Sequence, residues 1–188
     1  MTNFAVHTKQ TAPEKSVALL ESAEKAFGFV PNLIGTMAES PAAAKGYLTI
    51  GEIFDETSFS RTERQVVILA ASRYNECHYC MAAHSVVAEM QKVPDDVIEA
   101  IRVDRPITDP NLEALRAFTT AVVDKRGWVS DHDIEAFLEA GYTKEQILEV
   151  ILGVSMKTLS NYVNHIAHTP LDTAFAGKAW APEHKKAG

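Results

Sequence analysis

Two capping-box sequences constrain the fold most strongly, because each marks the start of a long apolar helix. Ser60-Arg61-Thr62-Glu63 precedes the apolar run 66–71, and Thr143-Lys144-Glu145-Gln146 precedes a longer run with apolar residues at helical spacing. In such a box the two side chains satisfy backbone N–H groups that the first helical turn leaves free. Alternating apolar and polar runs bounded by hairpin turns are nearly absent. The sequence therefore predicts an all-α fold.

Further helices are expected where proline, glycine and capping residues bound apolar patterns. The predicted ranges are 13–27, 31–37, 41–54, 60–74, 77–91, 94–101, 109–124, 130–140 and 143 to about 169. The last helix has as core candidates Ile147, Val150, Ile151, Val154, Leu159, Tyr162, Val163 and Ile166. Its polar cluster Asn161, Tyr162, Asn164 and His165 is interpreted as a mixture of core and solvent faces, with an oligomer interface or a pocket as the alternative. We expect one domain over 1–188.

Composition excludes several classes of protein. The net charge of -7 argues against a nucleic-acid partner, since phosphate binding needs clustered Lys and Arg. No stretch approaches the roughly 20 apolar residues of a membrane span, so no membrane partner is expected. The chain has two cysteines, in a single Cys-x-x-Cys, which is unlike a secreted disulfide framework. A cytoplasmic location is therefore expected, and the cysteine pair indicates chemistry or metal binding.

Cys77, Cys80 and His84 are expected to share one face of a helix, because positions i, i+3 and i+7 lie within about 60° of one another. A cysteine in the first helical turn faces free N–H groups and the positive end of the helix dipole, which favour the reactive thiolate. The second cysteine can then close a disulfide on the oxidised first one. The spacing predicts a redox-active dithiol.

Three other interpretations concern the same residues. Two cysteines and a histidine could bind zinc with a fourth ligand, although no second Cys or His pair, His165 and His168 included, is arranged for it. The cysteines could instead pack in the core. A thioredoxin-like fold is the usual setting of Cys-x-x-Cys in cytosolic proteins, but it needs strands, and none is expected around Cys77.

The segment from Glu63 to His84, with the core Cys77-His78-Tyr79-Cys80-Met81-Ala82-Ala83-His84, resembles the carboxymuconolactone decarboxylase and AhpD-like alkylhydroperoxidase superfamily. Its signature is Cys-x-x-Cys-x-x-x-His after an apolar helix. Upstream, Gly28-Phe29-Val30-Pro31-Asn32-Leu33 is similar to the Gly-x-Val-Pro-Asn segment of peroxidase-related members. The resemblance covers about two thirds of the chain, with its core motif at 60–91.

The resemblance implies an AhpD-like helical bundle and a role for each site residue. Cys80 is the thiol that attacks peroxide, Cys77 the resolving thiol and His84 a proton-relay group. The characterised alkylhydroperoxidases have a Glu in the relay where this chain has Gln65, and a neutral amide cannot exchange protons as a carboxylate can. Members of the superfamily generally form trimers or hexamers, so a homo-trimer or homo-hexamer is expected.

Three further side chains near the motif bear on the proton relay and the thiol pKa. Glu63 lies two residues from Gln65 and so on nearly the opposite helical face. Glu76 is another candidate acid for the relay. His78 could lower the pKa of a thiol or simply lie exposed at the helix start.

The predicted function is thiol-dependent reduction of alkyl hydroperoxides, with a thiol or disulfide electron donor and without cofactor or metal. The alternative is a dithiol-disulfide reductase or redox sensor with weak peroxidase activity, which Gln65 favours. A decarboxylase of the muconolactone branch is less expected, because that branch generally lacks the cysteine pair. A zinc-holding oligomeric module is the non-enzymatic alternative.

Overall fold

The computed structural model describes residues 4–182, and within that range it contains helices and connecting segments but no strand. The predicted all-α fold is confirmed. The helices are α1 (Glu14–Phe27), α2 (Asn32–Met37), α3 (Pro41–Asp55), α4 (Arg61–Tyr74), α5 (His78–Met90), α6 (Asp95–Arg102), α7 (Pro110–Asp124), α8 (Asp131–Glu139) and α9 (Lys144–Ala167), followed by a 3-10 helix, η1 (Thr173–Lys178).

The helix starts follow the capping sequences. Ser60 accepts the Glu63 N–H while the Glu63 carboxylate accepts the Ser60 N–H, and Thr143 and Gln146 form the same reciprocal pair at α9. A third box joins Ser130 to Asp133 at the start of α8. The predicted ranges agree with the observed ones to within one or two residues, because side-chain caps are local and depend little on tertiary packing.

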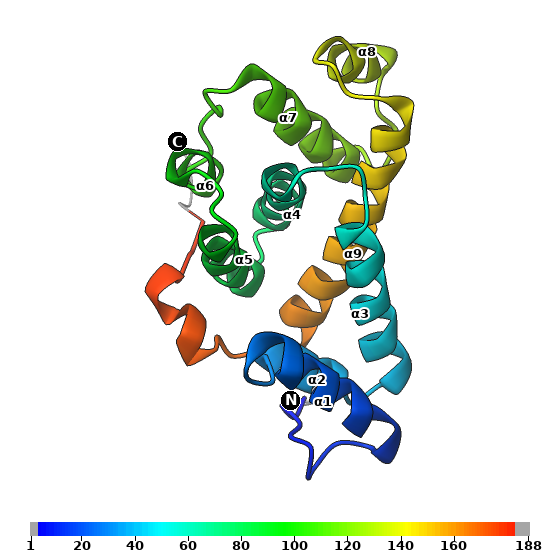
Figure 1. The fold of residues 1–188 in the computed structure, drawn as a ribbon, viewed down its shortest axis with the longest axis vertical. Coiled ribbons are helices and arrows are strands. Elements are labelled where there is room, and N and C mark those ends of the chain that lie inside the picture. Colours follow the sequence, from blue (N-terminus) through cyan, green and yellow to red (C-terminus); the bar gives the residue numbers. More distant parts are fainter. Residues whose placement is uncertain (1–3, 183–188) are drawn as a thin grey trace.

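Helix α4 is the central element, lying between α5, α7 and α9 (Figure 1). All eight of its residues from Gln65 to Ser72 are buried, so this helix has no solvent face over two turns. A helix that is apolar on every side must be covered on every side. The surrounding helices provide that cover.

Helix α9 crosses α3 and α4 closely at Gly153. A Cβ atom at this position would lie 2.8 Å from the Phe54 ring and 2.8 Å from the Val67 side chain, closer than carbon atoms can pack. Glycine therefore allows the backbones to approach here. The contact fixes which face of α9 points inward.

The predicted core face of α9 is partly wrong. Ile151, Tyr162 and Ile166 are exposed, by 44%, 54% and 68% respectively. Val150 is buried as predicted, and the inward face also carries Gly153, Met156, Lys157, Ser160, Asn161 and Asn164. The polar cluster is divided accordingly, since Asn161 and Asn164 are buried while Tyr162 and His165 are exposed. Half of the longest helix therefore buries polar side chains rather than apolar ones.

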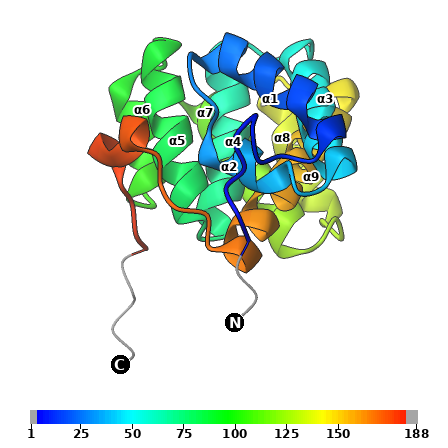
Figure 2. The same ribbon diagram turned by 90° about the horizontal axis from the view of Figure 1, so that it is seen from below.

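The segment after α9 returns to cover α5, and Figure 2 shows η1 beside that helix. Phe175 of η1 packs edge-on against Tyr79 of α5, with ring centroids 6.0 Å apart. Tyr79 donates a 2.5 Å hydrogen bond to Asp172 and accepts one from the Leu33 N–H at 3.2 Å. The Pro31-Asn32-Leu33 motif also bonds to this segment, since the Asn32 N–H donates to Asp172, so both pack together against the start of α5.

Candidate active site

The two cysteines lie at the start of α5, both as free thiols. Cys80 is in the first turn, whereas Cys77 is the N-cap residue with extended backbone angles (φ -81°, ψ 98°). The expectation that Cys77, Cys80 and His84 share one face of a continuous helix is therefore wrong for Cys77. An N-cap residue lies outside the helical spiral, so its side chain is not constrained to the i+3 direction.

Buried polar side chains of α9 face both sulfurs. The Asn164 amide nitrogen lies 3.3 Å from Cys80 Sγ and 3.6 Å from Cys77 Sγ, and donates to both. Ser160 Oγ lies 3.8 Å from Cys80 Sγ. The Asn161 side chain is held by a 3.0 Å hydrogen bond from Asn75. These groups can hydrogen-bond a sulfur anion without adding charge.

Lys157, one turn before Ser160, is the charged member of this face. Its side chain is fully buried, and Nζ has no hydrogen-bond partner with standard geometry in the described part of the chain. Burial alone would lower the pKa of Lys157, but the charge of the Cys80 thiolate, with smaller effects of Tyr47 and Cys77, raises it. Lys157 is therefore a buried ammonium whose charge is compensated by the dithiol.

The two thiols differ in acidity. Burial would raise the pKa of Cys80, but the Cys77 thiol as hydrogen-bond donor, the Lys157 charge, and Ser160 and Asn161 together lower it to about 5. The pKa of Cys77 is raised, first by that same hydrogen bond to Cys80 and then by burial. At neutral pH the pair therefore consists of a Cys80 thiolate and a Cys77 thiol.

His84 lies one turn beyond Cys80. Its pKa is well below the usual value, first because the ring is buried and second because of the Lys157 charge. Its Nδ1 is buried and has no hydrogen-bond partner among residues 4–182. The imidazole is therefore neutral at pH 7 and can accept a proton only at a considerable cost in free energy.

Gln65 lies near His84 but bonds elsewhere. Its Nε2 donates to Gln91 Oε1 at 3.1 Å, and its own Oε1 is buried with no partner in the described part of the chain. Gln65, His84 and Gln91 all line one inner cavity of about 290 Å³. The structure thus brings Gln65 to the surroundings of His84, as the resemblance implied, but as a neutral amide.

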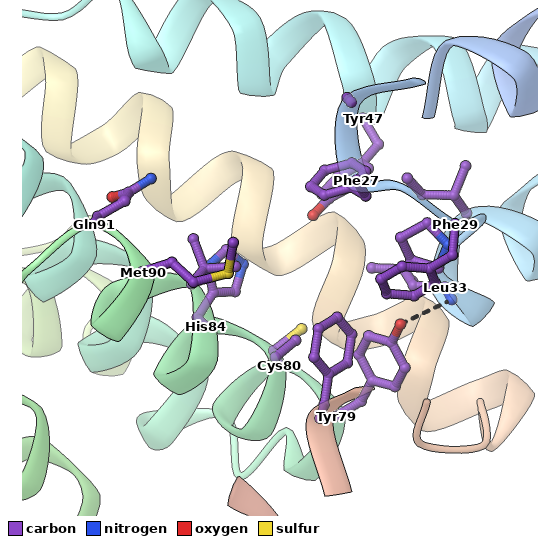
Figure 3. A pocket seen from close by; sticks show the side chains of 15 residues that line it. Phe27, Phe29, Leu33, Tyr47, Tyr79, Cys80, His84, Met90 and Gln91 are labelled. Carbon is purple, nitrogen blue, oxygen red and sulfur yellow. Dashed lines mark hydrogen bonds between the residues drawn. The ribbon is translucent and has the colours of Figure 1, made fainter. Parts of the chain in front are cut away.

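A larger apolar cavity of about 420 Å³ ends at Cys80 and His84 (Figure 3). Aromatic and aliphatic side chains of α1, α2, α3, α5 and η1 form its walls. The side chains labelled in the figure are Phe27, Phe29, Leu33, Tyr47, Tyr79, Cys80, His84, Met90 and Gln91. Its volume and apolar lining are typical of a site for a small organic molecule.

The other charged candidates lie away from this cavity. Glu63 caps α4 at Ser60. Glu76, in the left-handed region at φ 52°, is exposed and lines a different cavity from His84, so it does not serve a relay through that imidazole. His78 is exposed and its ring packs edge-on against Trp180, with centroids 5.8 Å apart.

Over residues 4–182, no group of three or more His, Cys, Asp and Glu side chains is arranged to hold a metal ion. Within the same residues, no helix has the length and hydropathy needed to cross a bilayer.

Sequence reasoning missed the residues that determine the state of the dithiol. Lys157, Ser160 and Tyr47 are not among the predicted site residues, and the cluster that contains Asn164 is predicted to mix core and solvent faces, with an oligomer interface or a pocket as the alternative. A signal was present, since Lys157, Ser160, Asn161 and Asn164 recur at spacings of three and four and so form one polar stripe. A lysine in the middle of the longest apolar helix is unusual unless it is paired.

Comparisons with known proteins agree with this description. Residues 41–121 match the model of the carboxymuconolactone decarboxylase family. A peroxidase-related protein with an alkylhydroperoxidase AhpD core from Ralstonia eutropha JMP134 superposes with a TM-score of 0.80, over 92% of this chain and 93% of that one, at 22% identity. No curated protein matches the chain significantly.

Two further solved structures have the same fold. The debrominase Bmp8, as a cysteine-to-alanine variant in complex with 2,3,4-tribromopyrrole, gives a TM-score of 0.79 over 95% of this chain and 96% of that one, at 18% identity. A peroxidase-related protein from Silicibacter sp. TM1040 gives 0.80 over 94% of each chain, at 15% identity. At these sequence identities, the similarity shows a shared fold.

Proposed function

Because the chain belongs to the AhpD-like carboxymuconolactone decarboxylase superfamily, we propose that it is a thiol-dependent reductase of small organic hydroperoxides. The observation that carries this proposal is the Cys80 sulfur at the end of an apolar cavity, beside a buried ammonium. The thiolate is the nucleophilic form of cysteine. A site built to hold an anionic sulfur against an apolar cavity suits attack on a weakly polar electrophile.

The reaction requires one proton for its leaving group. The Cys80 thiolate attacks the terminal oxygen of the hydroperoxide, so the O–O bond breaks, Cys80 becomes a sulfenic acid and an alkoxide leaves. The alkoxide takes a proton from the Lys157 ammonium and departs as an alcohol. The thiol of Cys77 then attacks the sulfenic sulfur, forming the disulfide and releasing water, which keeps the thiol proton.

This assignment gives Lys157 the task that the carboxylate has in the relay of characterised alkylhydroperoxidases. Gln65 is neutral and His84 is held neutral, so neither can supply a proton at pH 7. Lys157 stores the proton that Cys80 gives up when it ionises. Once Cys80 is oxidised, the ammonium loses its compensating charge, and its proton is released more easily.

The cavity also bears on which electrophiles are accepted. Its aromatic lining favours a hydroperoxide with an apolar organic group over hydrogen peroxide. Cys77 and Cys80 are 0% and 1% exposed, which disfavours a protein disulfide as substrate. The dithiol-disulfide reductase alternative therefore stays a prediction for small disulfides. The predicted homo-oligomer and cytoplasmic location also stay predictions.

A second candidate is reductive removal of halogen from a small haloaromatic compound. The aromatic-lined cavity beside a thiolate supports it, and a protein of this fold has been crystallised with 2,3,4-tribromopyrrole. In that reaction the Cys80 thiolate would take the bromine as a cation equivalent, and the ring carbanion would take a proton from the Lys157 ammonium. The Cys77 thiol would then displace bromide from the Cys80 sulfur, forming the disulfide and giving its proton to Lys157.

The test is to count thiols under denaturing conditions after one equivalent of cumene hydroperoxide or of 2,3,4-tribromopyrrole. The proposal predicts that the hydroperoxide consumes both thiols of the wild type, whereas Cys80→Ser keeps its remaining thiol. Loss of thiols with tribromopyrrole alone would favour the second candidate. Two titratable thiols after cumene hydroperoxide would refute the proposal, and two after tribromopyrrole would refute the second candidate.

A further inference from the structure

A second cavity, of about 370 Å³, lies on the other side of the dithiol and ends at Cys77. We call it the polar cavity. It lies between the start of α5 and the end of α9, and its walls include Glu76, His78, His165 and His168. These residues contrast with the aromatic walls of the apolar cavity.

The two sulfurs belong to different cavities. Cys80 lines the apolar cavity and not the polar one, while Cys77 lines the polar cavity and not the apolar one. Asn164 lies at the boundary, where its Nδ2 donates to both sulfurs. Each cavity therefore leads toward one member of the dithiol.

The polar cavity also contains an unused hydrogen-bond acceptor. Asn164 is 6% exposed, and its Oδ1 is buried without a partner in the described structure. Thr169, which lines the same cavity, likewise has a buried Oγ1 with no partner. Buried polar atoms are normally paired, so these two point to a ligand that offers an O–H or N–H group.

We propose that the polar cavity binds the electron donor, a small hydrophilic thiol with an O–H or N–H donor group, and presents it to Cys77. This inference rests on the proposed dithiol function. The cavity is of small-molecule size, and its walls include the hydrogen-bonding side chains of Glu76, His78 and His165 beside the ring of Tyr79, which it shares with the apolar cavity. Oxidant and reductant would then use separate entrances and would not compete for one site.

The chemistry favours attack at Cys77. The donor thiolate forms a bond to Cys77 Sγ, the Cys77–Cys80 bond breaks, and Cys80 leaves as a thiolate while Lys157 regains the proton lost by the donor. A second donor thiol then attacks the mixed disulfide, releasing the donor disulfide and Cys77, which takes the second proton. Exchange is fastest when the leaving sulfur is the more acidic one, which here is Cys80.

The test separates the two half-reactions. The disulfide is made with diamide, so that it does not depend on peroxide activity. Its reduction is then followed with 2-mercaptoethanol and with 1-propanethiol, which replaces the hydroxyl by a methyl group, at equal thiolate concentrations. Oxidation of the reduced protein by cumene hydroperoxide is followed separately.

Three tryptophan substitutions localise the entrances. His165→Trp, in the polar cavity, is expected to slow reduction by 2-mercaptoethanol by at least about tenfold and to leave oxidation within about twofold. Val87→Trp, in the apolar cavity, is expected to slow oxidation by cumene hydroperoxide and to leave reduction nearly unchanged. If Val87→Trp does not fold, Met90→Trp at the rim of the same cavity is used in its place. His132→Trp, on the exposed side of α8, is the matched control and should change neither rate.

The proposal also predicts faster reduction by 2-mercaptoethanol than by 1-propanethiol in the wild type. It is overturned if both thiols reduce the disulfide equally well, or if Val87→Trp slows both half-reactions and His165→Trp slows neither. If diamide forms no Cys77–Cys80 disulfide, the dithiol function fails, and the donor site with it. A disulfide that forms with diamide but not with hydroperoxide would refute only the proposed peroxidase reaction.

Discussion

The substitution Lys157→Met removes the buried positive charge and keeps a long apolar side chain in its place. The pKa of Cys80 is about 5, against an ordinary value of 9.0, and this difference corresponds to about 5 kcal/mol in favour of the thiolate. Several groups share that stabilisation, and Lys157 is the one with a full charge. If it supplies about half, the variant should have a Cys80 pKa near 7.

The expected consequence is a change in the pH profile. At pH 6 the thiolate fraction falls from about nine tenths to about one tenth, so alkylation of Cys80 by iodoacetamide should slow about tenfold. At pH 9 the thiol is ionised in both proteins, and the two alkylation rates should converge. The pH at half-maximal rate and the thiolate absorbance at about 240 nm measure the same shift independently.

Lys144→Met serves as the control, since Lys144 is exposed at the start of the same helix. It should leave the profile unchanged. A Lys157→Met variant with an unchanged midpoint, or one slowed equally at every pH, would refute the role of Lys157 as the counter-ion of Cys80. Peroxide turnover at pH 9 adds a second readout, because the variant would have its thiolate but would lack the proton donor.

Three further predictions concern the same site. Cys80→Ser leaves the Lys157 ammonium buried without a counter-charge and should lower the free energy of unfolding by about 3 kcal/mol at pH 7. In urea titrations, the double variant with Lys157→Met should regain most of that lost stability. Gln65→Glu should leave the peroxide rate at pH 7 within about twofold, because Lys157 already supplies the proton; a rate increase of about a hundredfold would show instead that the carboxylate relay is the missing component. Tyr79→Phe removes one of the two donors to Asp172, the other being the Asn32 N–H, and leaves the Leu33 N–H without its acceptor. It should cost about 1–3 kcal/mol in the same titrations, and an unchanged urea midpoint would contradict the structural role given to that hydroxyl.

The pH dependence of folding follows from the same pair of groups. The pKa of Cys80 is lower in the folded chain than in the unfolded one, so its contribution to stability is present at high pH and is lost as pH falls toward about 5. The pKa of Lys157 is raised, so its contribution is lost only as pH rises through that raised value. Reduced wild type should therefore gain stability over Cys80→Ser as pH increases from about 5 to 9.

Much of the fold could be predicted because its determinants are local. The boxes at Ser60 and Thr143, and the glycine that ends α1 in the left-handed region, act within a few residues of the chain. The dithiol and His84 were identified from their spacing. The same spacing predicted Cys77 within the helix, whereas Cys77 is the N-cap residue of α5.

The inward face of α9 could not be predicted, because both faces of that helix carry apolar residues. Tyr162 and Ile166 are as apolar as a core face requires, and only the close crossing at Gly153 turns them outward. The polar side chains of α9 that face the dithiol are buried there because they stabilise the negative charge of the Cys80 thiolate. This stabilisation depends on the tertiary contact between α5 and α9, which local sequence patterns do not indicate. Lys157 and Asn164 were therefore not predicted as site residues.

The central claim is that Cys80 is the reacting thiolate and Cys77 its resolving partner. Mass spectrometry of the protein treated with one equivalent of cumene hydroperoxide tests it most directly, using dimedone to trap sulfenic acid. The account predicts a dimedone adduct at Cys80 in Cys77→Ser, an intramolecular disulfide in the wild type and no adduct in Cys80→Ser. An adduct at Cys77 in Cys80→Ser, with Cys80 unmodified in Cys77→Ser, would contradict it.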